Sequence, residues 1–298
     1  MIDTMGKGKS DKFVEALGVL ISILGCCVGC SLSGRLYERN IQCEETITMA
    51  GSTSMEKLAD ALAESFMTEH PYVTVTAEFT GSSAGIEAVL TGSADIGISS
   101  RSLKEEEKAL GAVENIVAVE GIAIIVDMSN TVSALTVEQL TDIYTGGIRN
   151  WSELGGTDEA IVVIGREAGS GTREVFEGLL GVEYMCAYAN ELDSTGAVLA
   201  RTASTPGAIG YVSRDVANNM VQVLAINGFE PSDSNISKGS YPLSRPLFMI
   251  TKGAVSARKK AVQELFTYLH SEDGEGLIES VGLIVPKPYK PIRQYTEK

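Results

Sequence analysis

Histidine is nearly absent from this chain, with two among 298 residues. The scarcity argues against a metal site of several histidines and against a histidine general base, since His70 and His270 are the only candidates. Cysteine is also sparse: a zinc site with four cysteine ligands would need four of the five. Beyond the cluster near residue 30 only Cys43 and Cys186 remain, which predicts two free thiols rather than a disulfide scaffold. We expect no metal centre, no cofactor and no catalytic residue.

Basic residues are in deficit. The chain has 24 Lys and Arg against 39 Asp and Glu, for a formal net charge of -15. Such a chain is a poor partner for nucleic acid or for an anionic membrane surface, so any anion it binds must be captured by local donors. Hydrophobic residues make up 44% of the chain, which excludes wholesale disorder. The length fits one large domain or two medium ones.

The N-terminal apolar run is short. Lys7, Lys9 and Lys12 precede an apolar stretch over residues 16–24. A membrane-spanning helix needs about 20 apolar residues, whereas this length suits the hydrophobic region of a signal peptide.

The end of that run, Ile23-Leu24-Gly25-Cys26, resembles a bacterial lipoprotein signal, in which a small residue precedes the cysteine that becomes lipidated. We therefore expect a signal peptide over residues 1–25, lipidation of Cys26 and a polar tether over residues 26–43. Lipidation of Cys30 is the second choice, and an uncleaved anchor ending near Leu32 is the other alternative.

Strand and helix patterns alternate along the rest of the chain, which predicts an α/β fold with mostly parallel sheets. Apolar residues recur at helical spacing over residues 55–70, and residues 116–126 are apolar and β-branched, as in a buried strand. The stretch 227–244 is rich in Ser, Gly, Pro and Asn and predicts a long surface loop, and Trp151 is expected to anchor packing. The expected strands are 46–50, 72–79, 96–98, 116–126, 161–164, 208–212 and 247–250, and the expected helices are 55–70, 84–90, 104–110, 136–144, 172–180, 195–201, 256–270 and 274–281.

Three loops rich in Gly, Ser and Thr lie between an expected strand and an expected helix, at 50–54, 80–85 and 165–173. At a helix N-terminus the first N–H groups lack helical partners and the helix dipole is positive, a combination that binds tetrahedral oxyanions. Glycine lets the backbone approach a ligand closely, and hydroxyls add donors. The loops therefore predict an anion site.

The competing interpretation is that these residues only cap helices and form turns. One such loop is more often a cap, but three in one chain, one of them joined to Arg166, favour an anion site. Gly169-Ser170-Gly171-Thr172-Arg173 lacks the spacer and lysine of a nucleotide P-loop. Its first three residues also do not match the nucleophile elbow of hydrolases.

Several segments in order resemble the phosphate-binding lipoproteins of bacterial phosphate ABC transporters, which are PstS-like members of the type II periplasmic-binding-protein family. Each match is weak alone, but their order and spacing are specific, and together they cover nearly all of residues 45–290. The segments are 50–54, 81–85, 94–101, 120–123, 143–151, 166–173 and 206–212.

The resemblance implies two α/β lobes that clamp phosphate in a cleft between them, with a ligand-stabilised closed form. Lobe one would comprise residues 44–124 and 246–298, and lobe two residues 125–245, with a hinge at the two crossings. It further implies a lipid-anchored protein on the extracytoplasmic face of the cell membrane, which captures inorganic phosphate and delivers it to the permease subunits of an ABC transporter.

The resemblance also implies a set of ligand-binding residues. Arg166 corresponds to the arginine that pairs with phosphate, and the remaining positions are hydroxyl or backbone donors or their neighbours. The expected donors are Thr53, Ser82, Ser170, Gly171 and Thr172, and the neighbours that can substitute for them are Ser52, Ser54 and Ser83.

Two departures from the family pattern stand out. Some members have an aspartate where Ser100 stands, which accepts the proton of hydrogen phosphate, and an aspartate where Ala168 stands, which orients the arginine. Arg101 either reaches the ligand or pairs with Glu105 on the surface. Glu120 is either a replacement acceptor or, as the preferred interpretation, a buried structural carboxylate.

Other functions compete with phosphate capture. The same donors suit another tetrahedral oxyanion, such as sulfate, molybdate or tungstate. A hydrolase with Ser170 as nucleophile would need a general base, and neither histidine lies in a motif that suggests one. A surface adhesion or structural lipoprotein would use the loops as caps alone. The geometry of the three loops separates these hypotheses, because an anion site requires their donors to converge.

Overall fold

The structure is a computed structural model that describes residues 45–286. The expected signal peptide 1–25 and tether 26–43 lie outside this range, as do Cys26, Cys30 and Cys43. Cys186 is a free thiol, as expected. Among the described helices, none is long and apolar enough to span a bilayer.

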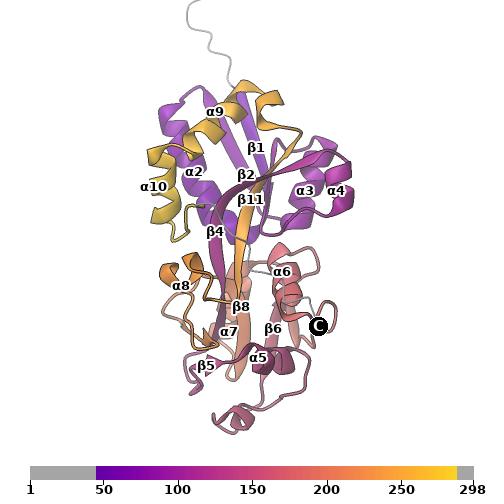
Figure 1. Cartoon of the computed structure of the whole chain (residues 1–298), viewed down its shortest axis with the longest axis vertical. Helices are drawn as coiled ribbons and strands as arrows, with labels where there is room; N and C mark the ends of the chain where they lie inside the picture. Colours follow the sequence, from indigo (N-terminus) through magenta and orange to yellow (C-terminus); the bar gives the residue numbers. More distant parts are fainter. Residues whose placement is uncertain (1–44, 287–298) are drawn as a thin grey trace, which may run out of the picture. The chain divides into compact units, whose positions relative to one another are not determined.

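Strands and helices alternate as the sequence predicts, which confirms the α/β class (Figure 1). The strands are β1 (Glu45–Gly51), β2 (Val73–Glu78), β3 (Ile96–Ser99), β4 (Ala112–Asp127), β5 (Ala134–Leu135), β6 (Val162–Arg166), β7 (Asn190–Leu192), β8 (Ala208–Ser213), β9 (Val221–Val223), β10 (Ala225–Ile226) and β11 (Ser244–Lys252). The helices are η1 (Thr53–Met55), α2 (Glu56–Glu69), α3 (Ser82–Thr91), α4 (Glu105–Ala109), α5 (Val137–Tyr144), η2 (Trp151–Leu154), α6 (Gly171–Leu180), α7 (Thr195–Ala203), α8 (Asp233–Ser237), η3 (Val255–Ala257), α9 (Lys260–Leu269) and α10 (Glu272–Ser280).

One sheet of nine strands runs through residues 45–286, in the order β2-β1-β3-β11-β4-β8-β6-β7 with β9 paired to β4. At each end of the sheet the strands pair in parallel: β2, β1 and β3 at one end, and β8, β6 and β7 at the other. At the centre, β4 and β11 run antiparallel to each other and to their outer neighbours β8 and β3. The expectation of mostly parallel pairing is therefore wrong at the centre. β4 leads the chain out of the group that contains β1 to β3, and β11 returns it in the opposite direction.

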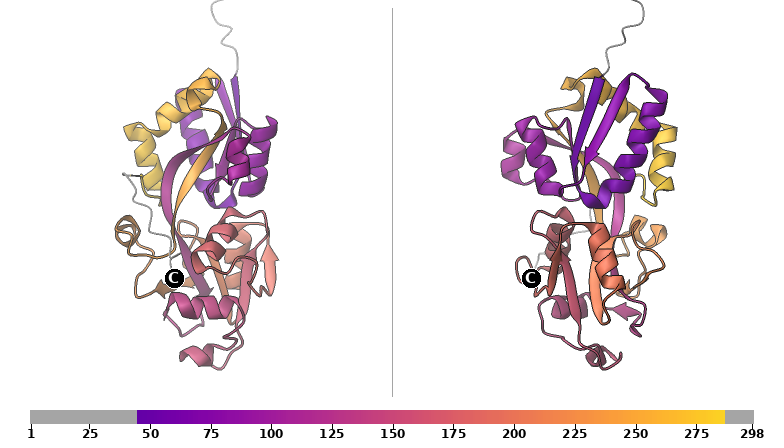
Figure 2. Two further views of the ribbon diagram at one scale, coloured as in Figure 1. Left: turned by 45° about the vertical axis from the view of Figure 1, so that its right-hand side comes forward. Right: turned by 180° about the vertical axis from the view of Figure 1, so that it is seen from behind.

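The long strand β4 joins two halves of the described fold (Figure 2). Its first part pairs with β11 as far as Gly121, and from Ile122 onward it pairs with β8. The first half contains β1, β2 and β3 with α2, α3, α4, α9 and α10. The second half contains β6, β7 and β8 with α5, α6, α7 and α8.

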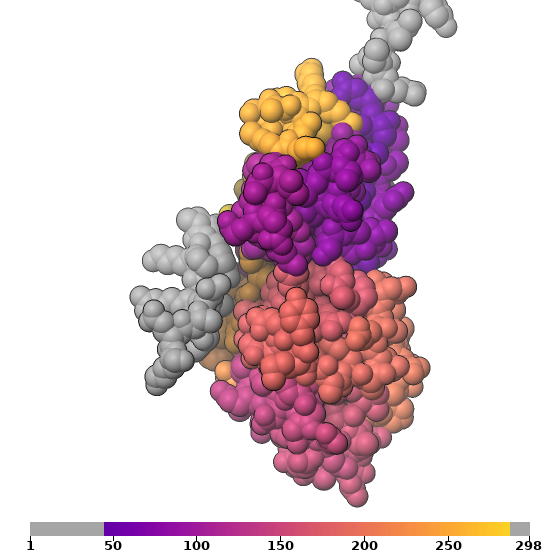
Figure 3. Space-filling view, turned by 90° about the vertical axis from the view of Figure 1, so that its right-hand side faces the viewer, coloured from indigo at the N-terminus to yellow at the C-terminus, as the bar shows by residue number. Residues whose placement is uncertain are grey.

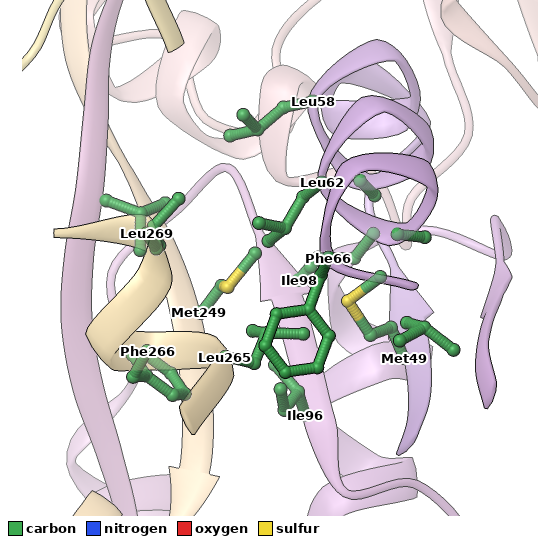
Figure 4. Packing of buried hydrophobic residues seen from close by; sticks show 14 of the residues in the cluster. Met49, Leu58, Leu62, Phe66, Ile96, Ile98, Met249, Leu265, Phe266 and Leu269 are labelled. Atoms are coloured by element: carbon green, nitrogen blue, oxygen red, sulfur yellow. The ribbon is translucent and has the colours of Figure 1, made fainter. Parts of the chain in front are cut away.

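The core of the first half forms where the apolar stripe of α2 meets the sheet and α9. Leu58, Leu62 and Phe66 are at most 1% exposed and share one face of α2, because residues four apart lie on the same side of a helix. They pack toward Met249 of β11 and Leu265 of α9 (Figure 4). This burial holds α2 against the sheet and α9, and so fixes the turn that precedes the helix.

The second half has its own core. Trp151 is fully buried there and donates its indole N–H to the Gly207 carbonyl oxygen at 3.0 Å, as expected of a packing anchor. The prediction of a surface loop over residues 227–244 is wrong in the middle of this range, because Ile236 of α8 and Tyr241 are buried there. The Tyr241 hydroxyl donates to the Ile122 carbonyl oxygen at 2.7 Å. Isolated apolar side chains in a polar stretch, Ile236, Tyr241 and Leu243, were the available signal.

Candidate functional site

Turns of the first half meet at one edge of the sheet. β1, β2 and β3 are parallel neighbours, so their carboxyl ends lie together, where α/β sheets place ligands. The Ser52 N–H donates to the Ile98 carbonyl oxygen at 2.9 Å, and the Gly81 N–H to that of Gly51 at 2.8 Å. Gly51 has φ +142°, and a Cβ there would lie 2.1 Å from the Ile98 oxygen. Only glycine allows the strands to end this close together.

Four buried serines form a hydrogen-bonded group at this edge, here called the serine cluster: Ser52, Ser54, Ser82 and Ser100. The Ser52 hydroxyl lies 2.9 Å from that of Ser54 and donates to that of Ser100 at 2.9 Å. The Ser82 and Ser100 hydroxyls are 3.2 Å apart. Neither η1 nor α3 has a side-chain cap bond at its N-terminus. The cap interpretation therefore does not account for these hydroxyls.

The N-terminus of α6 brings the third loop onto the serine cluster. A Cβ at Gly171 would lie 2.4 Å from the Ser82 Oγ and 2.9 Å from the Ser100 Oγ, so the glycine permits the close approach. The Thr172 hydroxyl donates to the Ser54 Oγ at 3.4 Å. The Ser170 hydroxyl accepts the Arg173 N–H at 3.3 Å, so this residue alone of the expected donors acts as a side-chain cap.

Arg166, which is 2% exposed, ends β6 beside the same region. Its Nε and Nη2 each donate to one carboxylate oxygen of Glu167 at 2.9 Å. Its Nη1 donates to the Thr195 Oγ1 at 3.0 Å. Glu167 thus orients the guanidinium.

Thr195 joins the candidate site, and the sequence analysis did not name it. It is buried at the start of α7, and its Oγ1 lies 3.1 Å from the Thr53 Oγ1 and accepts from Arg166. It therefore bridges the first and third loops. A signal was present, because a hydroxyl residue at a helix N-terminus is the same pattern as in the three chosen loops.

Arg101 is directed away from the serine cluster. Its Nη1 and Nη2 donate to the two carboxylate oxygens of Glu107 at 2.9 and 2.7 Å, and its Nε lies 3.1 Å from the Glu174 Oε2 on α6. Its Nη2 also donates to the Ser83 Oγ at 3.2 Å. Burial opposes the charge of Arg101, but the two carboxylates outweigh it and raise its pKa.

Glu105 is therefore not the partner of Arg101, and that expectation is wrong. Glu105 instead lies 2.9 Å from the Lys108 Nζ. Arg101 and Glu105 are four residues apart, which would bring them together on one helix. Arg101 precedes α4, however, so helical spacing does not apply to this pair.

A buried ion pair lies behind the serine cluster. The Arg245 Nε donates to the Glu120 Oε1 at 2.8 Å, and burial raises the pKa of Glu120. The Arg245 Nη1 donates to the Ser100 carbonyl oxygen at 3.1 Å and its Nη2 to the Ser54 Oγ at 3.3 Å. Glu120 contacts none of the four serines, which favours its interpretation as a structural carboxylate.

The site as a whole is a set of donors. Hydroxyls, helix N-termini and the Arg166 guanidinium come together from both halves, and within residues 45–286 no carboxylate accepts a hydrogen bond from the serine cluster. Such a set can hold an oxyanion against the negative charge of the chain.

The family model described as "PBP superfamily domain" matches residues 41–273. The chain is also similar to the phosphate-binding protein PstS of Bacillus subtilis. The two are 35% identical over 236 residues, which cover 76% of each chain.

Two solved structures share the fold and more than a third of their residues with this chain. One is a candidate phosphate ABC transporter substrate-binding protein from Clostridium perfringens with bound phosphate, at 36% identity and a TM-score of 0.78. The matched region covers 82% of this chain and 100% of the chain in that structure. The other is an ABC-type phosphate transport receptor from Vibrio cholerae, at 35% identity and a TM-score of 0.69, which covers 80% of this chain and 100% of its own.

Proposed function

Because this chain belongs to the PBP superfamily and, within it, to the PstS family of phosphate-binding proteins, we propose that it captures inorganic phosphate for a phosphate ABC transporter. The observation that carries the proposal is the convergence of donors from both halves on one buried place, with Arg166 beside the serine cluster. The 36% identity to a structure with bound phosphate supports it.

The proposed ligand contacts follow from the placement of the donors. Arg166 supplies the positive charge, and the N-terminus of α6 supplies N–H groups at Gly171 and Thr172. The serine cluster and Thr53 supply hydroxyls, and Thr195 joins them. Arg101 and Ser83 are left out of this set, because the Arg101 guanidinium is held by Glu107 and Glu174 and donates to the Ser83 hydroxyl.

We further propose that the protein acts on the extracytoplasmic face of the cell membrane, held by a lipid on Cys26, and passes phosphate to permease subunits. The sequence Ile23-Leu24-Gly25-Cys26 supports this, and a diacyl lipid would suffice for stable attachment, which needs two acyl chains. Mass spectrometry of the mature N-terminal peptide tests it. Diacylglycerol on Cys26 is expected, modification of Cys30 would move the cleavage site, and an unmodified N-terminus would refute the anchor.

Catalysis is not part of the proposal. The Ser170 hydroxyl accepts a backbone N–H of α6, and each histidine ring lies against the end of its own helix. The Nδ1 atoms of His70 and His270 are 3.1 and 2.6 Å from the carbonyl oxygens of Phe66 and Phe266. A second oxyanion is the stronger alternative, because no carboxylate among the described residues meets the serine cluster to select for a protonated ligand.

Calorimetric titration of the purified chain with inorganic phosphate tests the function. We expect binding by the parent and at least about a tenfold loss in Arg166→Ala, because a charge-assisted hydrogen bond contributes about 1.5–3 kcal/mol. Arg149→Ala is the matched control, since Arg149 is exposed and donates to the Gly146 carbonyl oxygen. No phosphate binding by the parent would reject the function, and unchanged affinity in Arg166→Ala would remove this residue from the site.

A further inference from the structure

The Ser54 hydroxyl receives two hydrogen bonds. The Arg245 Nη2 donates to it at 3.3 Å and the Thr172 hydroxyl at 3.4 Å. A hydroxyl has one proton and two acceptor lone pairs, so these donors occupy both lone pairs. The Ser54 proton is then directed at its remaining neighbour, the Ser52 Oγ at 2.9 Å.

The same reasoning sets the direction of the other hydroxyls. The Ser52 hydroxyl donates to the Ser100 Oγ at 2.9 Å, which leaves the Ser100 proton for the Ser82 Oγ at 3.2 Å. The Ser82 Oγ also accepts the Ser100 backbone N–H at 3.1 Å. The chain of donors therefore runs from Ser54 through Ser52 and Ser100 to Ser82. A guanidinium can only donate, so Arg245 fixes the direction at its start.

We propose that Arg245 is a positioning residue of the anion site, which acts through Ser54 to present the serine hydroxyls as donors to the bound oxyanion. The inference rests on the proposed function and names a residue beyond the ligand contacts assigned above. An oxyanion lying against the serine cluster accepts the hydrogen bonds that the serine hydroxyls otherwise donate to one another.

Glu120 holds Arg245 in this position. The two residues face each other across β4 and β11, and both are 1% exposed. The Glu120 Oε1 accepts from both Nε and Nη2 of Arg245, and the Ser213 hydroxyl donates to the Glu120 Oε2. An ion pair alone would need no more than these contacts. The Arg245 guanidinium also donates hydrogen bonds to the Ser54 hydroxyl and to the Ser100 carbonyl oxygen.

A double-mutant cycle tests the proposal, with the full mature chain and inorganic phosphate in calorimetric titrations. The four proteins are the parent, Arg245→Lys, Ser54→Ala and the double variant. Lysine keeps the charge beside Glu120 but lacks the planar fork that reaches Ser54 at the same time. Thermal unfolding without phosphate shows whether each protein folds.

We expect Arg245→Lys to weaken phosphate binding about fivefold or more when Ser54 is present, and by less than about twofold in the Ser54→Ala background, since residues that share one hydrogen bond are coupled. Arg214→Lys is the control: Arg214 pairs with Asp233 and contacts no serine of the cluster, so affinity should not change. If Arg245→Lys does not fold, the neutral pair Arg245→Met with Glu120→Gln takes its place in the cycle, with the same coupling expected.

Equal losses in both backgrounds, or no loss in either, would overturn the positioning role while leaving phosphate capture standing. A parent that does not bind phosphate would reject the proposed function and this inference with it. The two failures are therefore distinguishable in one experiment.

Discussion

At the scale of single residues, we expect the residue at position 100 to decide how the site responds to the proton of the ligand. The Ser100 hydroxyl is buried and lies between those of Ser52 and Ser82. An aspartate there would accept the proton of hydrogen phosphate and repel sulfate, which has none. A serine can donate or accept, so it penalises sulfate less.

Ser100→Asp should therefore sharpen the rejection of sulfate and make phosphate binding fall at high pH, where the ligand has fewer protons to donate. Competition titrations with sulfate across pH measure both effects in the parent and the variant. Ser102→Asp is the control, because Ser102 is exposed next to the site. Strong rejection of sulfate by the parent would contradict the placement of Ser100 and point to another acceptor, with Glu120 the first to test.

Glu107 gives a pH-dependent prediction. Burial disfavours its charge, but the hydrogen bonds from Arg101 and from the Lys104 N–H, together with the positive charges of both residues, outweigh burial and hold the pKa of Glu107 below its ordinary value of 4.5. A depressed pKa contributes stability above the unfolded value, and this contribution is lost as pH falls through the folded one. Glu107→Gln should lower the free energy of unfolding by about 1–2 kcal/mol at neutral pH, and the difference should shrink well below pH 4.5.

Urea denaturation of both proteins at the two pH values measures the difference. Glu105→Gln serves as the matched control, because its carboxylate is exposed and, within residues 45–286, pairs with Lys108 alone. A deficit in Glu107→Gln that persists unchanged in acid would show that the effect is not electrostatic.

At the scale of elements, α6 links the two halves twice. Its N-terminus meets the serine cluster through Gly171, and one turn further Glu174 lies 3.1 Å from the Arg101 Nε and 3.5 Å from the Lys104 Nζ. In Figure 3 the surface of the segment with α3 and α4 adjoins that of the segment with α6. Glu174 thus joins the halves without contacting the proposed ligand.

Glu174→Gln should therefore speed phosphate release about two- to fivefold with little change in association, because a partly exposed ion pair contributes about 0.2–1 kcal/mol. Stopped-flow measurement of release checks this, with Glu183→Gln as the control on the exposed loop after α6. An unchanged release rate would mean that the ion pair does not hold the halves together.

At the scale of the described fold, two cores are joined through β4 and β11, and the donors lie between them. A ligand that binds both halves should favour the form in which they meet. Saturating phosphate should therefore reduce the radius of gyration in small-angle X-ray scattering. It should also stabilise the fold, by about 2.7 kcal/mol when free phosphate is a hundred times the dissociation constant.

Arg166→Ala at the same phosphate concentration is the control for this compaction, since it lacks the main cation of the site. Equal scattering curves with and without phosphate, under conditions where calorimetry shows binding, would contradict closure. The lobe boundaries at 124–125 and 245–246 stay a prediction. Small-angle X-ray scattering of variants substituted at these positions, with and without phosphate, tests it.

The sequence by itself determined the alternation of strands and helices and the three loops, whereas the role of Arg166 in binding stays a prediction. These features are local: apolar period, helix start signals and turn residues act over a few neighbouring positions. The stripe of α2 and the hydroxyls at the starts of η1, α3 and α6 were readable for this reason. The polar stretch around α8 misled because its three buried apolar side chains, Ile236, Tyr241 and Leu243, are too few to show a period.

Only the tertiary structure decided which donors share a site and what orients them. Thr53 and Thr195 are 142 positions apart, and Ser54 and Arg245 are 191 apart. Arg101 contacts Glu174 on the other half of the fold in addition to Glu107 on its own half. Contacts at such separations leave no periodic trace along the chain, because they arise from the pairing of β4 with β11 and the packing of two cores.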